Sequence, residues 1–198
     1  MDPALANLQR IPYNYFMNLK LLTRLLVVGC LVLLSAPSGG DPIAEIDSIR
    51  ARQRSIAKNK DSYKQVQATI EYQEASSTEK ITGFYDKNVL RLIERELGGD
   101  WCLYRTQFYL HKGAAFFVFE DRDCRYAEGG REFIQTRLYL QGKTCLRKLV
   151  RHAASREKVS KIKNKSKTCP ASDVQDQARA VQEAIKALNR ARKKKPGP

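Results

Sequence analysis

Side chains suited to acid–base or metal chemistry are sparse in this 198-residue chain. Its two histidines, His111 and His152, have no partner at a spacing typical of a metal site or a catalytic triad. Acidic residues cluster at 94–96 and 120–123, but the arginines among them favour local ion pairs over a general acid and base. We therefore assign no catalytic, cofactor-binding or metal-binding residue and expect a non-enzymatic protein.

Four cysteines follow residue 40: Cys102, Cys124, Cys145 and Cys169. An even number favours two disulfides in an oxidising compartment. A hairpin turn centred near residues 112–113 would place Cys102 opposite Cys124, and facing residues on neighbouring strands lie within disulfide reach. We therefore predict a Cys102–Cys124 bond, which leaves Cys145 to pair with Cys169. Free thiols in a reducing compartment are the alternative.

Three tyrosines could form a recognition surface on one sheet face: Tyr85, Tyr109 and Tyr139. Strand alternation places them opposite a buried face that would include Phe84, Phe108 and Leu138. Tyrosine provides a large contact area at a low entropy cost, which suits recognition. The alternative, which we favour, is that the rings pack on cross-strand neighbours or under a terminal helix.

An internal repeat indicates the elements that carry these residues. Its three copies lie at residues 82–93, 106–119 and 136–150, and each contains Thr, an aromatic residue or Leu, and Tyr before a short turn with Asn or Gly. Asn and Gly tolerate the positive φ angles of tight hairpin turns. Three successive hairpins predict an antiparallel meander.

Amphipathic helices are predicted on both sides of the meander. Asp41-Pro42 is a helix-start signal, and isoleucines at helical spacing predict a helix over 42–60. Residues 63–72 alternate as a strand would, although they could also extend that helix. A capping-box pattern at Ser172–Gln175 starts a second predicted helix over 173–192. The predicted fold is therefore α+β, an antiparallel β-meander of about three hairpins flanked by two helices.

The segment 17–40 has the three parts of a secretory signal peptide. A basic stretch precedes a ten-residue apolar run, Leu25–Leu34, and small residues follow it to Gly40. Ten helical residues rise only about 15 Å, too little to cross a bilayer. Cleavage after Gly40 is expected; a lipid anchor at Cys30 is the second possibility and an uncleaved anchor is the third. Residues 1–16 are either a spurious extension before Met17 or a short cytoplasmic one.

The mature chain divides into three parts by composition: a helix-plus-meander domain over 41–150, a basic connector over 151–171, and a C-terminal amphipathic helix with a basic tail over 172–198. From Leu146 to Pro198 there are 16 Lys and Arg against 4 Asp and Glu, a net charge of +12 out of +15 for the whole chain. Such a basic flank predicts an anionic partner, and a solvated flank that only aids solubility is the alternative. Nucleic acid is not expected, because no Phe, Trp or Tyr follows Tyr139 to stack on bases.

Three segments resemble parts of a group of exported bacterial proteins of unknown function with repeated Tyr-x-x-x-Gly hairpins between terminal helices. The segments are Phe108–Gly113 (FYLHKG), Phe116–Glu120 (FFVFE) and Leu138–Lys143 (LYLQGK). The resemblance implies a helix-flanked antiparallel meander, and it implies no activity and no site residues.

Together these features predict a periplasmic or secreted binding or structural envelope protein. Its partner would be an anionic envelope surface or an unidentified protein, and the sequence does not indicate an oligomeric state. The alternatives are an inhibitor or immunity-type binder of an exported enzyme, or a small secreted hydrolase. In the hydrolase, acids distant in sequence would converge: Glu94, Glu120, Asp121 and Asp123.

Overall fold

The computed structural model describes residues 41–72 and 77–194. The predicted signal peptide (17–40), with Cys30, and the extension before it (1–16) lie outside the described residues, as do residues 195–198. The described part of the chain therefore begins at Asp41, the first residue after the predicted cleavage point.

The described chain forms one eight-stranded antiparallel sheet in which every strand pairs with its sequence neighbours. The strands are β1 (Lys64–Tyr72), β2 (Ser77–Asp86), β3 (Val89–Gly98), β4 (Cys102–His111), β5 (Ala114–Arg125), β6 (Arg131–Gln141), β7 (Thr144–Ala153) and β8 (Lys165–Lys167). The three predicted hairpins are confirmed as β2–β3, β4–β5 and β6–β7. The sheet is larger than predicted, because β1 and β8 add one strand at each edge.

The three hairpins share one turn design. Their two-residue turns have positive φ angles at Lys87 (57°), Lys112 (51°) and Gly142 (59°). Each hairpin also has a register shift close to its turn, immediately after Phe84, Tyr109 and Tyr139 respectively. Because a bulge increases local twist and bends a strand, three bulges at equivalent positions bend the sheet along one line.

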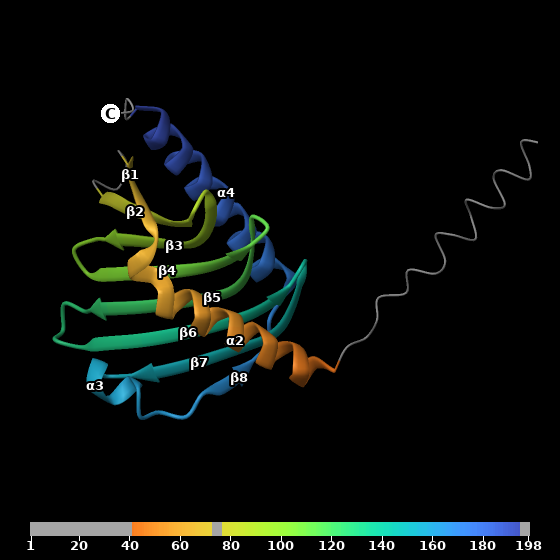
Figure 1. Cartoon of the computed structure of the whole chain (residues 1–198). Coiled ribbons are helices and arrows are strands. Elements are labelled where there is room, and N and C mark those ends of the chain that lie inside the picture. The colour runs from red at the N-terminus through yellow and green to blue at the C-terminus, as the bar shows by residue number, and fades with distance from the viewer. Residues whose placement is uncertain (1–40, 73–76, 195–198) are drawn as a thin grey trace, which may run out of the picture. The chain divides into compact units, whose positions relative to one another are not determined.

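Two helices cover opposite faces of this sheet (Figure 1). The first, α2 (Pro42–Asn59), begins as predicted, with the Asp41 carboxylate accepting a hydrogen bond from the Ile43 amide at 2.9 Å. The second, α4 (Ala171–Lys194), begins just after Pro170, so Ser172 lies within the helix rather than at its cap. Two shorter helices, η2 (Lys60–Ser62) and α3 (Arg156–Val159), follow α2 and β7.

Each sheet face has its own hydrophobic core. Under α2 the buried side chains are Ile46, Ile49, Ile56, Phe84, Leu92, Tyr109, Phe116, Phe117, Tyr139 and Leu149. Under α4 they are Ile81, Ile93, Phe108, Leu110, Val118, Leu138, Leu140, Val174, Val181, Ala184 and Leu188. The sheet is therefore the middle layer of three, which explains why both of its faces are apolar near the hairpin turns.

The first hairpin places its aromatic residues on the faces opposite to those predicted. Phe84 packs under α2, with Leu92 between it and Tyr109, whereas the ring of Tyr85 lies 4.9 Å from the Arg192 guanidinium of α4. The cause is visible in the repeat, since one residue separates Tyr85 from the two turn residues and two separate Tyr109 from its own. A shift of one residue moves every side chain of a strand to the other face.

The helix α4 is held to the sheet by a close approach and by a buried ion pair. A Cβ atom at Gly83 would lie 2.6 Å from Leu188 Cδ1, so only glycine fits there without movement. Arg95 binds both carboxylate oxygens of Glu79, at 2.6 and 2.8 Å, and donates a third hydrogen bond to the Ala180 carbonyl of α4 at 3.0 Å. Glu79 is only 3% exposed.

The predicted basic connector over 151–171 is not a plain linker. It contains the end of β7, the helix α3 and the edge strand β8. Val159 of α3 packs with Phe133 and Ala153 in a third small core. The connector therefore folds back onto the last strands of the sheet.

Candidate functional site

The two edges of the sheet differ in a way that bears on function. At one edge, β8 has only three residues, two of them lysines, and short lysine-rich edges resist pairing with other chains. At the other edge, β1 has nine residues, and its outer side has no strand partner among residues 41–72 and 77–194. The free backbone groups of β1 are therefore available to an extended segment.

A groove of about 1260 Å³ lies along β1 and the C-terminal half of α4. Its lining residues are Lys64, Gln65, Val66, Gln67, Ala68, Thr69, Ile70, Glu183, Lys186, Ala187, Arg190, Ala191, Arg192 and Lys194. Seven consecutive β1 residues line the groove, so both alternating sets of side chains border it. The groove therefore follows the strand and its edge.

The alternation of β1 and the helical period of α4 build the two walls. Val66, Ala68 and Ile70 pack against the core under α4, while the residues between them are polar. On α4, Ala184 and Leu188 are fully buried against the sheet. Lys186, which lies between them, and Arg190, which follows them, place charged side chains at the groove.

The groove is strongly basic. Five of its lining residues are cationic, namely Lys64, Lys186, Arg190, Arg192 and Lys194, and Glu183 is the single acid among the residues lining it. The last turns of α4 belong to the predicted basic tail. Five other lysines of that flank lie on or between α3 and β8, next to the opposite edge of the sheet: Lys158, Lys161, Lys163, Lys165 and Lys167. These cations of the predicted basic flank therefore lie in two places, the groove between β1 and α4 and the β8 edge of the sheet.

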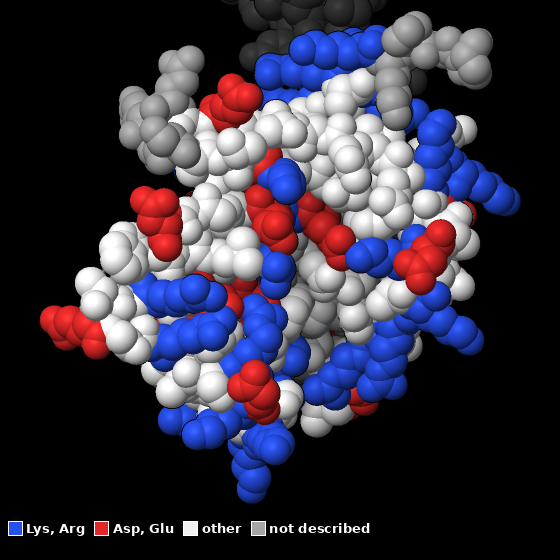
Figure 2. All heavy atoms as spheres, turned by 90° about the vertical axis from the view of Figure 1, so that its left-hand side faces the viewer, with Lys and Arg blue, Asp and Glu red and all other residues white. Residues whose placement is uncertain are grey.

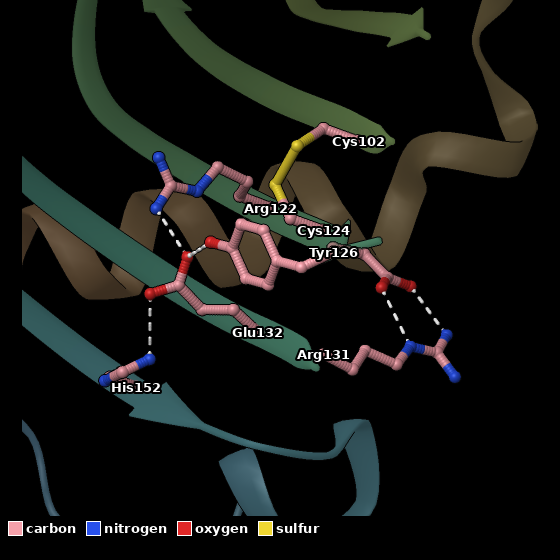
Figure 3. The surroundings of a disulfide bond; sticks show 8 residues. Cys102, Arg122, Cys124, Tyr126, Arg131, Glu132 and His152 are labelled. Atoms are coloured by element: carbon pink, nitrogen blue, oxygen red, sulfur yellow. Dashed lines mark hydrogen bonds and ion pairs between the residues drawn. A yellow bond between two sulfur atoms is a disulfide. The ribbon is translucent and has the colours of Figure 1, made fainter. Parts of the chain in front are cut away.

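Both predicted disulfides are present. Cys102–Cys124 joins facing residues of β4 and β5, and Cys145–Cys169 joins β7 to the segment that precedes α4. The first lies beside the β5–β6 connection (Figure 3). Two disulfides indicate a non-cytoplasmic, oxidising environment.

The three predicted recognition tyrosines are buried. Tyr109 and Tyr139 lie beneath α2, each 4% exposed, and Tyr85 lies on the other face of the sheet at 5% exposed. Tyr109 and Tyr139 flank Phe117, with ring centroids 5.6 and 5.1 Å from it. The rings pack under the terminal helices and present no joint exposed surface.

The structure does not bring together the four acids that a hydrolase would need. Glu94 binds Lys60 at 2.7 Å on the α2 face, whereas Glu120 accepts a hydrogen bond from Gln177 of α4 on the opposite face. Asp121 and Asp123 lie close together, but both bind Arg156, and Asp123 also forms two hydrogen bonds with Arg131. Hydrogen bonds from Arg131 lower the pKa of Asp123, which disfavours it as a proton donor.

A carboxylate cluster that the sequence does not reveal lies beside the β5–β6 connection. Glu132 Oε2 accepts hydrogen bonds from Tyr126 at 2.7 Å and Arg122 at 2.9 Å, and its Oε1 lies 2.9 Å from His152 Nε2 (Figure 3). The hydrogen bond from Tyr126, aided by the Arg122 and His152 charges, lowers the pKa of Glu132. This saturated carboxylate is a poor base, and the cluster fits an ion-pair network. Figure 2 shows a central group of acidic side chains on this side of the molecule, with basic side chains next to it and below it.

The remaining chemical candidates are isolated. His111 is exposed beside the β4–β5 turn. Within the described ranges, no three metal-ligating side chains converge. In the same part of the chain, no helix combines the length and apolar character needed to span a bilayer.

Comparison with known proteins adds no assignment, because no family model, curated protein or solved structure matches the chain.

Proposed function

We propose that this protein is an exported, non-enzymatic binding protein that holds an extended acidic polypeptide segment in the groove between β1 and α4. The segment would pair with the free edge of β1 as an added antiparallel or parallel strand. Its carboxylates would face the cations of α4. The observation that carries the proposal is a long strand edge that has no strand partner within the described residues and borders a groove lined by five cations and one acid.

Two features favour a polypeptide over other anions. An added strand gains backbone hydrogen bonds from β1 and specificity from alternate side-chain positions. A lipid surface or an acidic polymer would use the charge but not the strand edge. A second copy of this chain is disfavoured as the occupant, because each copy carries a formal net charge of +15 and the copies would repel one another.

The proposed location rests on separate support. Segment 17–40 has the pattern of a signal peptide, and the two disulfides fit a compartment outside the reducing cytoplasm. An inhibitor or immunity-type binder of an exported enzyme would be one form of this function. In that case the acidic segment would belong to the enzyme.

The test uses a fluorescent peptide of alternating Glu and Val, about as long as β1, and measures its anisotropy with the protein from residue 41 onward. We expect saturable binding at low salt that weakens steeply at high salt, because exposed charge pairs are screened. The double variant Lys186→Glu with Arg190→Glu places like charges opposite the peptide. It should weaken binding by about tenfold or more.

The matched control is Lys165→Glu with Lys167→Glu on β8, which makes the same charge change at the other edge of the sheet. It should bind the peptide almost as the unaltered protein does. A peptide of the same sequence that is methylated on every backbone nitrogen has no N–H group to donate to β1 and should bind weakly.

Three results would overturn the proposal. The α4 variant and the β8 variant could lose affinity equally, which would mean that only net charge matters. The peptide methylated on every backbone nitrogen could bind as well as the original, which would exclude strand addition. Alternatively, the protein could sediment with phosphatidylglycerol vesicles that the peptide fails to displace, which would make a lipid surface the occupant.

A further inference from the structure

A second pocket lies on the α2 face of the sheet, away from the groove. It has a volume of about 360 Å³ and is lined by Arg50, Gln53, Arg54, Gln107, Phe117, Phe119, Arg137 and Tyr139. Three of these residues come from α2 and the others from β4, β5 and β6. Its volume lies within the range typical of small-molecule sites.

Arg137 is the central cation of this pocket. Its guanidinium lies 5.4 Å from the centroid of the Phe119 ring, and Nη1 donates a hydrogen bond to Asn164 Oδ1 at 2.9 Å. No carboxylate lies within 4.0 Å of it among the residues that the structure describes. Burial, together with the charge of nearby Arg151, lowers the pKa of Arg137. A partly buried cation without a counter-charge is costly, and an anion would relieve that cost.

Two more arginines approach the pocket from α2. The Arg50 guanidinium lies 5.6 Å from the centroid of the Tyr139 ring, and Arg50 also binds Asp47 at 2.9 Å. Arg54 makes no ion pair within the described part of the chain. The pocket therefore presents three guanidinium groups, of which one is already paired.

The acids nearest to the pocket are engaged elsewhere. Glu94 accepts a hydrogen bond from Gln107 Nε2 at 2.8 Å and also binds Lys60. Behind Arg137, Arg151 donates to the Ser160 carbonyl, and its buried Nε has no partner within the described residues. Asp47 and Glu94 are thus each bound to a cation, while Arg137 and Arg54 have no carboxylate partner among the described residues.

We propose that this pocket binds a phosphate group, held by Arg137 with Arg54 and Arg50. Guanidinium groups match phosphate oxygens through paired hydrogen bonds, and more than one arginine suits a dianion. Phe119 and Tyr139 hold two of the arginines in place. The half-buried Phe119 also offers aromatic surface to the body of a phosphomonoester. This site is on a different face from the proposed peptide groove and does not depend on it.

The experiment compares inorganic phosphate and phenyl phosphate with sodium chloride at matched ionic strength, by calorimetric titration and by thermal unfolding. We expect both phosphates to bind and to raise the melting temperature, because a ligand that binds the folded state stabilises it. Phenyl phosphate should bind more tightly, since its ring can contact the aromatic wall.

The variant Arg137→Met should lose phosphate affinity by about tenfold or more, because the central fork is gone. Without phosphate it should be as stable as the unaltered protein or more so, since a partly buried, unpaired charge is removed. Arg137→Lys keeps the positive charge but not the paired hydrogen bonds of a guanidinium. Its phosphate affinity should lie between that of Arg137→Met and that of the unaltered protein. The matched control is Arg179→Met, an exposed arginine of α4 on the other face of the sheet.

A further arm identifies the source of the phosphate. Vesicles with phosphatidic acid that bind the protein in an Arg137-dependent way, while free phosphate does not, would assign the site to a lipid headgroup. Binding of free phosphate that vesicles do not mimic would assign it to a small solute. Equal phosphate binding by Arg137→Met and the unaltered protein, or the absence of binding in every arm, would overturn the proposal.

Discussion

The ionisation of Glu120 depends on how α4 packs against the sheet. It lies on the α4 face of β5, where Gln177 Nε2 donates a hydrogen bond to its Oε1 at 2.8 Å. Burial raises the pKa of Glu120, and the hydrogen bond from Gln177 and the charge of Lys148 offset part of that rise. The ionised form therefore costs stability at neutral pH, and the protonated form does not.

We predict that Glu120→Gln increases the free energy of unfolding at about pH 7.5 and has little effect at about pH 4. The folded-state pKa of Glu120 is raised, so the protonated form is the one that folding favours. The glutamine keeps an oxygen for Gln177 and removes the charge that is costly to bury. Chemical denaturation at the two pH values provides the measurement. A gain of the same size at both would contradict the explanation.

Individual residues could be predicted only where neighbours along the chain set their positions. Cys102 and Cys124 are symmetric about a tight turn, so their pairing follows from the hairpin. Arg50, Phe119 and Arg137 line one pocket only because α2 lies over the strands that carry the other two, and no spacing in the sequence records that arrangement. Glu132 likewise gathers its partners from β5, the β5–β6 connection and β7.

Among the elements, α4 depends on a strand-to-helix contact as well as on its apolar face. Arg95 of β3 joins the buried Glu79 carboxylate to the Ala180 carbonyl, and the Tyr72 hydroxyl also donates to Glu79 at 2.9 Å. The pair fixes where α4 crosses the sheet. It thereby sets one wall of the groove.

We expect Arg95→Met to lower the free energy of unfolding by about 3 kcal/mol, because it leaves the Glu79 charge buried and unpaired. The double variant Glu79→Leu with Arg95→Met should recover most of that loss, since both charges are then absent. Urea unfolding of the single and double variants measures both values. A double variant less stable than Arg95→Met would show that the pair contributes net stability.

Elements with strong apolar periodicity were predictable, and those without it were not. The isoleucines of α2 and the hairpin repeats led to the observed elements within a few residues. The strand β8 consists of Lys-Ser-Lys and has no apolar residue to indicate it. The faces of Phe84 and Tyr85 were predicted wrongly, because the prediction aligned the three repeats by their tyrosines. In the first repeat the turn follows the tyrosine one residue sooner than in the second.

At the scale of the whole molecule, the Cys145–Cys169 disulfide ties the C-terminal end of the connector to β7. Cys145–Cys169 spans 24 residues, and this loop contains α3 and β8. We predict that replacing both cysteines with serine lowers the free energy of unfolding by about 3 kcal/mol, the loop-closure entropy for this length. Denaturant unfolding measures the loss.

The replacement of Cys102 and Cys124 by serine is the comparison, since that loop spans 22 residues. Chain entropy predicts a similar loss for both pairs. An unchanged unfolding midpoint in either variant would contradict a stabilising role for that bond.

The contact between β1 and α4 affects the order in which the parts of the molecule fold. Each strand pairs with its neighbour along the chain, so the sheet can grow from local contacts. The groove needs the first strand and the last helix to meet, and loop closure between distant segments is entropically costly. The groove should therefore form last and open first during local unfolding, which makes ligand binding a more sensitive reporter of native structure than the sheet itself.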